Sequence, residues 1–146
     1  TVTLQESAME PTYSVGKKFF VNRALYKIKS PKRGDVIVFK TSASDDAALH
    51  IRRVIGLPGE TVQIKEGQIY INGNVYEENG AYQEIADGGL ADSAITLESG
   101  EYFVLGDNRN NSEDSRFSDI GNISKKYIVG KIWFTVSPKS KIGFIR

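Results

Sequence analysis

The chain contains no cysteine and only one histidine among its 146 residues. Without cysteine there is no disulfide, no thiolate metal site and no cysteine nucleophile. A single histidine without cysteine also disfavours a zinc or haem site, so we expect no metal and no cofactor. No apolar run approaches the roughly 18 residues that a membrane-spanning helix needs, so we expect that this chain itself does not cross a bilayer.

An excess of either charge is also missing. The formal net charge is +1 although 25% of the residues are charged, which gives no electrostatic reason to expect nucleic acid or an acidic membrane surface as a partner. The hydrophobic fraction of 40% is ordinary for a globular protein, and this length normally allows one real core. We therefore predict a single domain over residues 1–146.

No internal repeat and no amphipathic helix of about ten residues is evident. Short alternating or β-branched segments instead follow one another between turns that contain glycine or proline, which predicts a mainly β fold with few or no helices. Residues 61–71 have the pattern of a hairpin, whereas residues 74–99 show little periodicity and are predicted to be an irregular excursion. Strands are predicted at residues 1–5, 18–27, 36–39, 49–57, 61–64, 68–71, 101–105, 127–136 and 142–145, and a short helical turn within residues 123–127.

The most polar stretch is G-D-N-R-N-N-S-E-D-S-R at residues 106–116. It directly follows the predicted strand at residues 101–105. Two carboxylate–guanidinium pairs are predicted within it, because Asp107 stands near Arg109 and Asp114 near Arg116. From local reasoning alone this is either a solvated charged turn or an ordered loop that forms part of a site.

Four stretches, in this order and spacing, resemble the sequence boxes of type I signal peptidases. Residues 6–12, E-S-A-M-E-P-T, resemble the family's S-M-x-P-T box, and residues 33–39, R-G-D-V-I-V-F, resemble its second box. Residues 52–60, R-R-V-I-G-L-P-G-E, resemble K-R-V-x-G-x-P-G-D, and residues 106–116 match G-D-N-R-x-x-S-x-D-S-R at every fixed position. The resemblance covers nearly the whole chain and is nearer to Gram-positive-type members than to those of the endoplasmic reticulum.

This resemblance implies a membrane-anchored serine endopeptidase with a Ser/Lys dyad, which removes signal peptides from exported proteins. The implied fold has two antiparallel β-sheet regions around a shallow, apolar groove that takes an extended peptide by strand addition. The implied partner is the extended segment of an exported preprotein or pilin, and the implied location is the extracytoplasmic face of the cell membrane. The family's N-terminal membrane anchor would precede Thr1.

Both reacting residues of the family are replaced in this chain. The nucleophilic Ser, which stands directly before Met in the family, corresponds to Ala8, and the general-base Lys before Arg-Val corresponds to Arg52. Loss of the serine nucleophile lowers turnover in comparable proteases by about a millionfold. Arg keeps its proton up to about pH 12 and has no lone pair to offer. The chain is therefore predicted not to hydrolyse peptides.

The remaining positions of the implied site are largely kept. By resemblance, Ser112 supplies the hydroxyl that orients the base, and the backbone N–H of Ala8 contributes to the oxyanion hole. Glu6 stands where some members have a Ser as the second oxyanion donor, so that donor is missing. The residues implied to brace the loop are Asp107 with Arg109 and Asp114 with Arg116.

Four neighbouring positions complete the interpretation. Met9 and His50 are expected to line the peptide-binding groove, although a buried place in the core also suits Met9. Ser7 is expected to face away from the groove, because successive side chains alternate in an extended segment. Asp119 departs from the family, which usually has Gly there.

Two explanations of the replaced dyad stay open. The chain is either a natural non-catalytic homologue, like those in pilus-assembly clusters that act as assembly or chaperone-like factors, or an active signal peptidase I captured as an inactivated mutant. Two different replacements favour natural loss, and Arg52 would then serve as a cation for Glu6 or for the C-terminus of a partner. A self-cleaving repressor domain with a related Ser/Lys core would need a DNA-binding region, and it would not explain residues 106–116.

Overall fold

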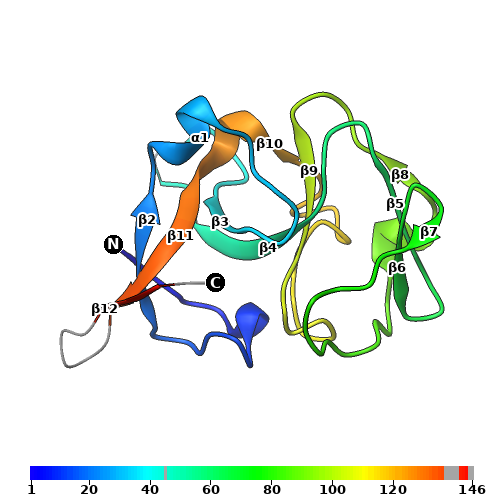
Figure 1. The fold of residues 1–146 in the computed structure, drawn as a ribbon, viewed down its shortest axis with the longest axis horizontal. Coiled ribbons are helices and arrows are strands. Elements are labelled where there is room, and N and C mark those ends of the chain that lie inside the picture. Colours follow the sequence, from blue (N-terminus) through cyan, green and yellow to red (C-terminus); the bar gives the residue numbers. More distant parts are fainter. Residues whose placement is uncertain (45, 137–141, 145–146) are drawn as a thin grey trace.

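The structure, a computed structural model, describes residues 1–44, 46–136 and 142–144, and most of its regular secondary structure lies in two antiparallel sheets (Figure 1). The larger sheet has the strand order β1-β2-β11-β3-β4-β9-β10, with β12 paired to β11, and the smaller has the order β7-β6-β5-β8. The larger sheet comprises β1 (Val2–Thr3), β2 (Lys18–Asn22), β3 (Val36–Phe39), β4 (His50–Gly56), β9 (Glu101–Leu105), β10 (Ile123–Ser124), β11 (Ile128–Val136) and β12 (Ile142–Phe144). The smaller comprises β5 (Thr61–Lys65), β6 (Gln68–Ile71), β7 (Asn74–Val75) and β8 (Ile95–Thr96). This confirms the predicted mainly β fold with two antiparallel sheets.

The centre of the larger sheet is the β-branched run of β3, whose four residues are all buried. β3 pairs with β11 on one side and with β4 on the other, and Ile37 lies opposite Arg52 in that pairing. β4 in turn pairs with β9, the strand that leads into residues 106–116. The sheet therefore places the motifs at residues 33–39 and 52–60 side by side, next to the strand that leads into residues 106–116.

The smaller sheet grows from the predicted hairpin, which is confirmed. Its turn lies at Glu66 and Gly67, both with positive φ angles of 50° and 77°, as the favoured two-residue hairpin turns require. The excursion at residues 74–99 is more regular than predicted, because its two ends supply β7 and β8 as outer strands. Between them lies only one turn of 3-10 helix, η2 (Gly89–Asp92).

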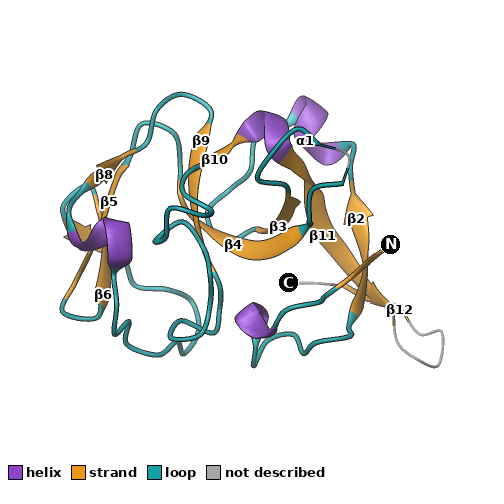
Figure 2. Ribbon diagram, turned by 180° about the vertical axis from the view of Figure 1, so that it is seen from behind, coloured by secondary structure: helices purple, strands orange, loops and turns teal. Residues whose placement is uncertain are grey.

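A shared apolar cluster packs the two sheets together. Ile55, Phe103 and Leu105 of the larger sheet and Val62 and Ile64 of the smaller sheet are all 4% exposed or less and belong to this cluster. At roughly 1.5–3 kcal/mol for each large apolar side chain buried, such a cluster is a major stabilising contribution. Figure 2 shows β4 and β9 lying between the rest of the larger sheet and the smaller one.

The helical segments are short. One of them lies where a strand was predicted, so that part of the strand prediction is wrong. The strand predicted for residues 18–27 ends at Asn22, and the single α-helical turn α1 (Leu25–Ile28) follows. The Asn22 Oδ1 accepts hydrogen bonds from the backbone N–H groups of Ala24 and Leu25, which favours the turn over a continued strand. Residues 123–127 form β10 and then the 3-10 helix η3 (Lys125–Tyr127), and residue 145 lies outside the described residues. None of the helices in the described part of the chain is both long and apolar enough to span a membrane.

Candidate active site

The first motif forms a 3-10 helix, η1 (Ser7–Met9), that rests against the polar loop after β9. The backbone N–H of Asn108 donates a 2.8 Å hydrogen bond to the carbonyl oxygen of Ala8, and the Asn108 side-chain amide donates to the Ser7 carbonyl at 3.2 Å. In Figures 1 and 2, η1 is the short coil near the N-terminal strand, on the side that faces this loop. Two segments about 100 residues apart are thereby held together.

Ala8, Arg52 and Ser112, the three central positions of the implied site, line one cavity of about 210 Å³. Ala8 comes from η1, Arg52 from β4 and Ser112 from the loop after β9. The seven lining residues are Glu6, Ser7, Ala8, Arg52, Asn111, Ser112 and Glu113. The fold thus assembles the dyad positions and the orienting hydroxyl position at a single place.

Arg52 is almost fully buried, with 1% of its surface exposed. Its Nε donates a 2.7 Å hydrogen bond to the Glu113 carbonyl oxygen, and one terminal nitrogen donates to the Ile51 carbonyl at 2.7 Å. The same nitrogen lies 2.6 Å from the Glu6 carboxylate. A buried guanidinium needs such partners, because an uncompensated charge in the interior is strongly destabilising.

Glu6 links Arg52 to His50. Its Oε2 contacts Arg52, while its Oε1 lies 3.2 Å from the His50 Nδ1. The hydrogen bond with His50 and then the bond and charge of Arg52 lower the pKa of Glu6 to about 2, against the opposing effect of burial. His50 itself packs against Phe39, with ring centroids 5.6 Å apart. Glu6 is therefore a carboxylate at neutral pH and neutralises the cation of the site.

Ser112 belongs to a second charged group built on Asp114. The Ser112 hydroxyl donates to Asp114 Oδ2 at 2.9 Å, and the backbone N–H of Gly106 donates to the same oxygen at 3.0 Å. Arg116 donates to both carboxylate oxygens of Asp114, at 2.8 and 2.9 Å. Asp114 and Arg116 are both buried, and the ion pair predicted for them is present. Such bidentate pairs fix a loop in one geometry.

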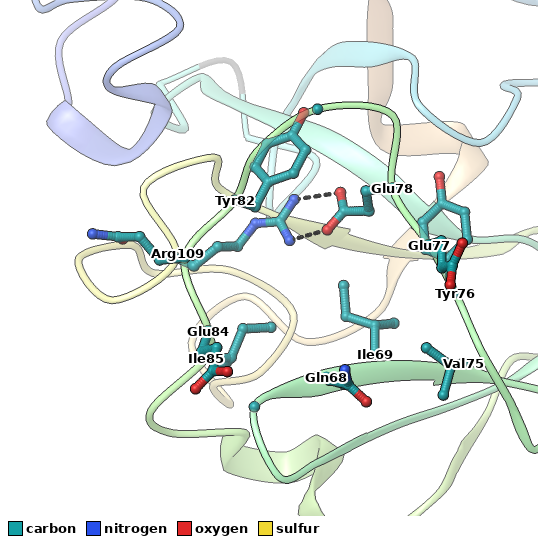
Figure 3. A pocket seen from close by; sticks show the side chains of 13 residues that line it. Gln68, Ile69, Val75, Tyr76, Glu77, Glu78, Tyr82, Glu84, Ile85 and Arg109 are labelled. Carbon is teal, nitrogen blue, oxygen red and sulfur yellow. Dashed lines mark hydrogen bonds and ion pairs between the residues drawn. The ribbon is translucent and has the colours of Figure 1, made fainter.

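The other predicted ion pair is wrong. Asp107 does not pair with Arg109 but binds Arg53 through two hydrogen bonds of 2.8 and 2.7 Å. Arg109 is bound by both carboxylate oxygens of Glu78, within the excursion, and Tyr82 lies against its guanidinium at 4.2 Å. Figure 3 shows this arrangement at the edge of a second cavity, of about 240 Å³. Asp107 and Arg109 therefore attach the loop to two other parts of the fold.

Three neighbouring predictions also change. Met9 does not line the cavity with Ala8; it is fully buried in a core cluster with Phe19 and Ile51. Ser7 lies on the cavity and not away from it, because a 3-10 helix replaces the extended backbone on which the alternation was assumed. His50 is mostly buried; it does not line the cavity, and Glu6 connects it to Arg52 there.

The comparisons with known proteins agree with this geometry. A family model described as "Signal peptidase, peptidase S26" matches residues 1–137. The chain belongs to this family. It is 31% identical over 146 residues to a probable signal peptidase I-2 of Synechocystis, a match that spans 97% of this chain and 65% of that relative. It is 38% identical over 142 residues to a signal peptidase I of Bacillus amyloliquefaciens, a match that spans 92% of this chain and 74% of the relative.

Among solved structures, a crystal structure of a signal peptidase I from Enterococcus faecalis is similar to this chain with a TM-score of 0.55 at 32% identity. The match covers 72% of this chain and 98% of that one. The signal peptidase fold is thus shared. The chain spans about two thirds of the length of the Synechocystis relative. The activity, substrates and partners of the whole protein are therefore proposed below and do not follow from the match.

Within the described residues of this signal peptidase family member, no group of three or more His, Asp or Glu side chains is placed to hold a metal ion. Sequence reasoning missed three residues that bind site or loop side chains: Glu113, Glu78 and Arg53. The Glu113 carbonyl could not be found, since any residue has one, and Glu78 lies in a segment without periodicity. Arg53 carried a usable signal, because in a regular strand it points to the face opposite Arg52 and so requires a counter-ion of its own.

Proposed function

We propose that this signal peptidase family member binds extended segments of exported proteins without hydrolysing them. The observation that carries the proposal is that Ala8 and Arg52 share one cavity with Ser112 and supply neither a nucleophile nor a base. Ala8 offers only a methyl group, and the guanidinium of Arg52 has no lone pair with which to accept a proton. A peptide docked beside them would form no acyl-enzyme.

The two hydroxyl groups near the cavity do not replace the missing nucleophile. A serine becomes nucleophilic only when a neighbouring base takes its proton. The Ser112 hydroxyl donates to Asp114, but both oxygens of that carboxylate are already bound by Arg116. Ser7 lines the cavity, yet the carboxylate nearest to it in sequence, Glu6, is held by His50 and Arg52. Asp114 and Glu6 are therefore already engaged by cations and are not free to act as bases for these serines.

The partner we propose is a peptide in extended conformation, from the signal-peptide region of a preprotein or from a pilin. Strand addition at a sheet edge next to the site would supply backbone hydrogen bonds, as in other extended-peptide complexes. Membership of the signal peptidase family supports this class of partner. We further propose that the protein acts at the extracytoplasmic face of a bacterial membrane, and that assistance in pilus assembly is the form its function takes.

The binding proposal is tested with a fluorescent peptide that carries a signal-peptide cleavage region. Fluorescence anisotropy should show saturable binding while chromatography recovers the peptide intact. Asn111→Trp would fill the exposed side of the cavity and should weaken binding at least tenfold. The matched control, Asn79→Trp, alters an exposed asparagine that lines a different cavity and should bind like the parent. Equal weakening by both variants, or no binding at all, would refute the assignment of the site.

The second candidate is an active signal peptidase I in which positions 8 and 52 have been changed. The observation that favours it is the kept loop brace, Asp114 with Arg116 and Ser112, together with relatives that carry the name signal peptidase I. The natural coding sequence decides between the candidates at once, because it shows which residues stand at positions 8 and 52. A natural Ser and Lys there would establish the enzyme.

A further inference from the structure

The contact between Glu6 and Arg52 has a chemical consequence beyond loop bracing. Arg52 is 1% exposed, and the ion pair with the Glu6 carboxylate, at 2.6 Å, supplies the counter-charge of this buried cation. The other partners of its guanidinium are the carbonyl oxygens of Ile51 and Glu113, which are dipoles and carry no net charge. The Glu6 carboxylate therefore offsets the cost of burying the permanent positive charge of Arg52.

We infer that Glu6 is a third determinant of the non-catalytic state, a fixed counter-ion that would keep any amine at position 52 protonated. A catalytic lysine must lose its proton near neutral pH, which requires burial without a nearby opposite charge. A carboxylate in contact does the reverse, since an opposite charge within about 4–6 Å favours the ammonium form. This inference rests on the proposed absence of hydrolysis and names a further residue that maintains it.

The position of Glu6 has a second effect on the same chemistry. It stands two residues before Ala8, on the cavity that holds Ala8 and Arg52. Negative charge that develops on a substrate carbonyl near Ala8 would meet a carboxylate, whereas a hydroxyl donor there would stabilise it. The side chain of Glu6 therefore opposes both proton abstraction at position 52 and oxyanion formation at position 8.

Other charged groups near position 52 do not contribute in the same way. His50 reaches Arg52 only through Glu6, with its Nδ1 3.2 Å from the Glu6 carboxylate. Glu113 turns its carbonyl to Arg52, and the residue is exposed. Asp114 lies behind Ser112 and is neutralised by Arg116. Glu6 is thus the carboxylate whose removal should change the behaviour of an amine at position 52.

This has a consequence for restoring the dyad. A double variant with Ala8→Ser and Arg52→Lys would regain both reacting groups, yet its amine would still face Glu6. A weak or absent activity of that double variant therefore does not by itself show natural loss of function. The informative comparison is between the double variant and the triple variant that also carries Glu6→Ser.

The direct test measures the proton affinity of the new amine and needs no catalysis. Arg52→Lys, Glu6→Ser/Arg52→Lys and the near-isosteric Glu6→Gln/Arg52→Lys are labelled with carbon-13 at the lysine ε-carbon and titrated by NMR. The resonance that is absent from the parent protein reports on position 52. We expect the pKa of this amine to fall by at least one pH unit, a tenfold change in proton affinity, when Glu6 is removed. Glu113→Gln/Arg52→Lys is the matched control and should change it by less than about 0.3.

An amine pKa that is the same with and without Glu6, in whichever of the two Glu6 variants folds, would overturn the inference. An equal fall of the amine pKa in the Glu113 control would overturn it too, since removal of any nearby negative charge would then have the same effect. Cleavage of a signal peptide by the unsubstituted chain would instead refute the proposed function, and it would leave the amine comparison unaffected. The two failures are therefore distinguishable.

Discussion

Asp107 and Arg53 form a bidentate ion pair that fastens the loop after β9 to strand β4. The two hydrogen bonds are 2.8 and 2.7 Å long, and Arg53 also donates to the Gly34 carbonyl at 2.9 Å. Arg53 is the next residue after Arg52 and points to the other face of the strand. The pair therefore sets the position of the strand segment that carries Arg52 against the loop that carries Ser112.

Asp107→Asn should destabilise the protein strongly. The Asp107 side chain is buried, and its loss would leave the mostly buried Arg53 without a counter-ion. Breaking a buried pair by removing one partner lowers the free energy of unfolding by about 3–5 kcal/mol, which urea denaturation would measure. Asp119→Asn, an exposed carboxylate nearby in sequence, is the control and should change it by less than about 0.5 kcal/mol. Similar values for both variants would mean that the pair contributes little.

Glu78→Gln should release the excursion from the loop. Arg109 is 1% exposed and is held by Glu78, with Tyr82 against its guanidinium. Loss of the charge should accelerate backbone hydrogen exchange in residues 76–85, because fewer contacts then oppose local opening. Glu77→Gln alters the adjacent exposed carboxylate and should leave exchange unchanged. Unchanged exchange in both variants would contradict an anchoring role for Glu78.

Stability at low pH should depend on Glu6. The hydrogen bond with His50 and the contact with Arg52 hold the pKa of Glu6 at about 2, below its ordinary value of 4.5. The stabilisation by this carboxylate is therefore fully present above about pH 4.5 and is lost as the pH falls toward 2. The difference in free energy of unfolding between the parent and Glu6→Gln should narrow over that range. A difference that is constant from pH 6 to pH 2 would show that folding does not lower the pKa of Glu6.

Gly106→Ala should destabilise the protein, because the added methyl group would collide with two residues that line the cavity. A methyl group at Gly106 would overlap the Ser112 hydroxyl and lie 2.6 Å from the Ala8 carbonyl oxygen. Such overpacking lowers the free energy of unfolding by about 1–3 kcal/mol. In a Ser112→Gly background one of the two overlaps is gone, so the same substitution should be less destabilising. Equal penalties in both backgrounds would show that Ser112 does not crowd Gly106.

Several features of this fold were predictable because residues close together in the sequence determine them. The β-branched run of β3 and the hairpin of β5 and β6 appear as expected, since periodicity and turn residues determine both. The pair of Asp114 with Arg116 was also predicted correctly; only Ser115 stands between the partners in sequence. These features depend on neighbours in the chain.

The wrong predictions concern contacts between distant segments. Asp107 stands two residues from Arg109, yet each finds its partner elsewhere, at Arg53 and at Glu78. The pairing of β4 with β9 brings Arg53 within reach of Asp107. This strand pairing cannot be inferred from the spacing of the two residues in the sequence. Ser7 was misplaced for a different reason, because three residues of 3-10 helix are too short to leave a periodic pattern.

The central claim is tested most directly by the intact mass of a substrate after incubation with this chain. A preprotein with a signal-peptide cleavage region, mixed with the unsubstituted protein in lipid or detergent, is analysed by mass spectrometry over many hours. We predict that the preprotein keeps its full mass while it binds. A product shortened at the signal-peptide junction, absent from an incubation without the protein, would contradict the account.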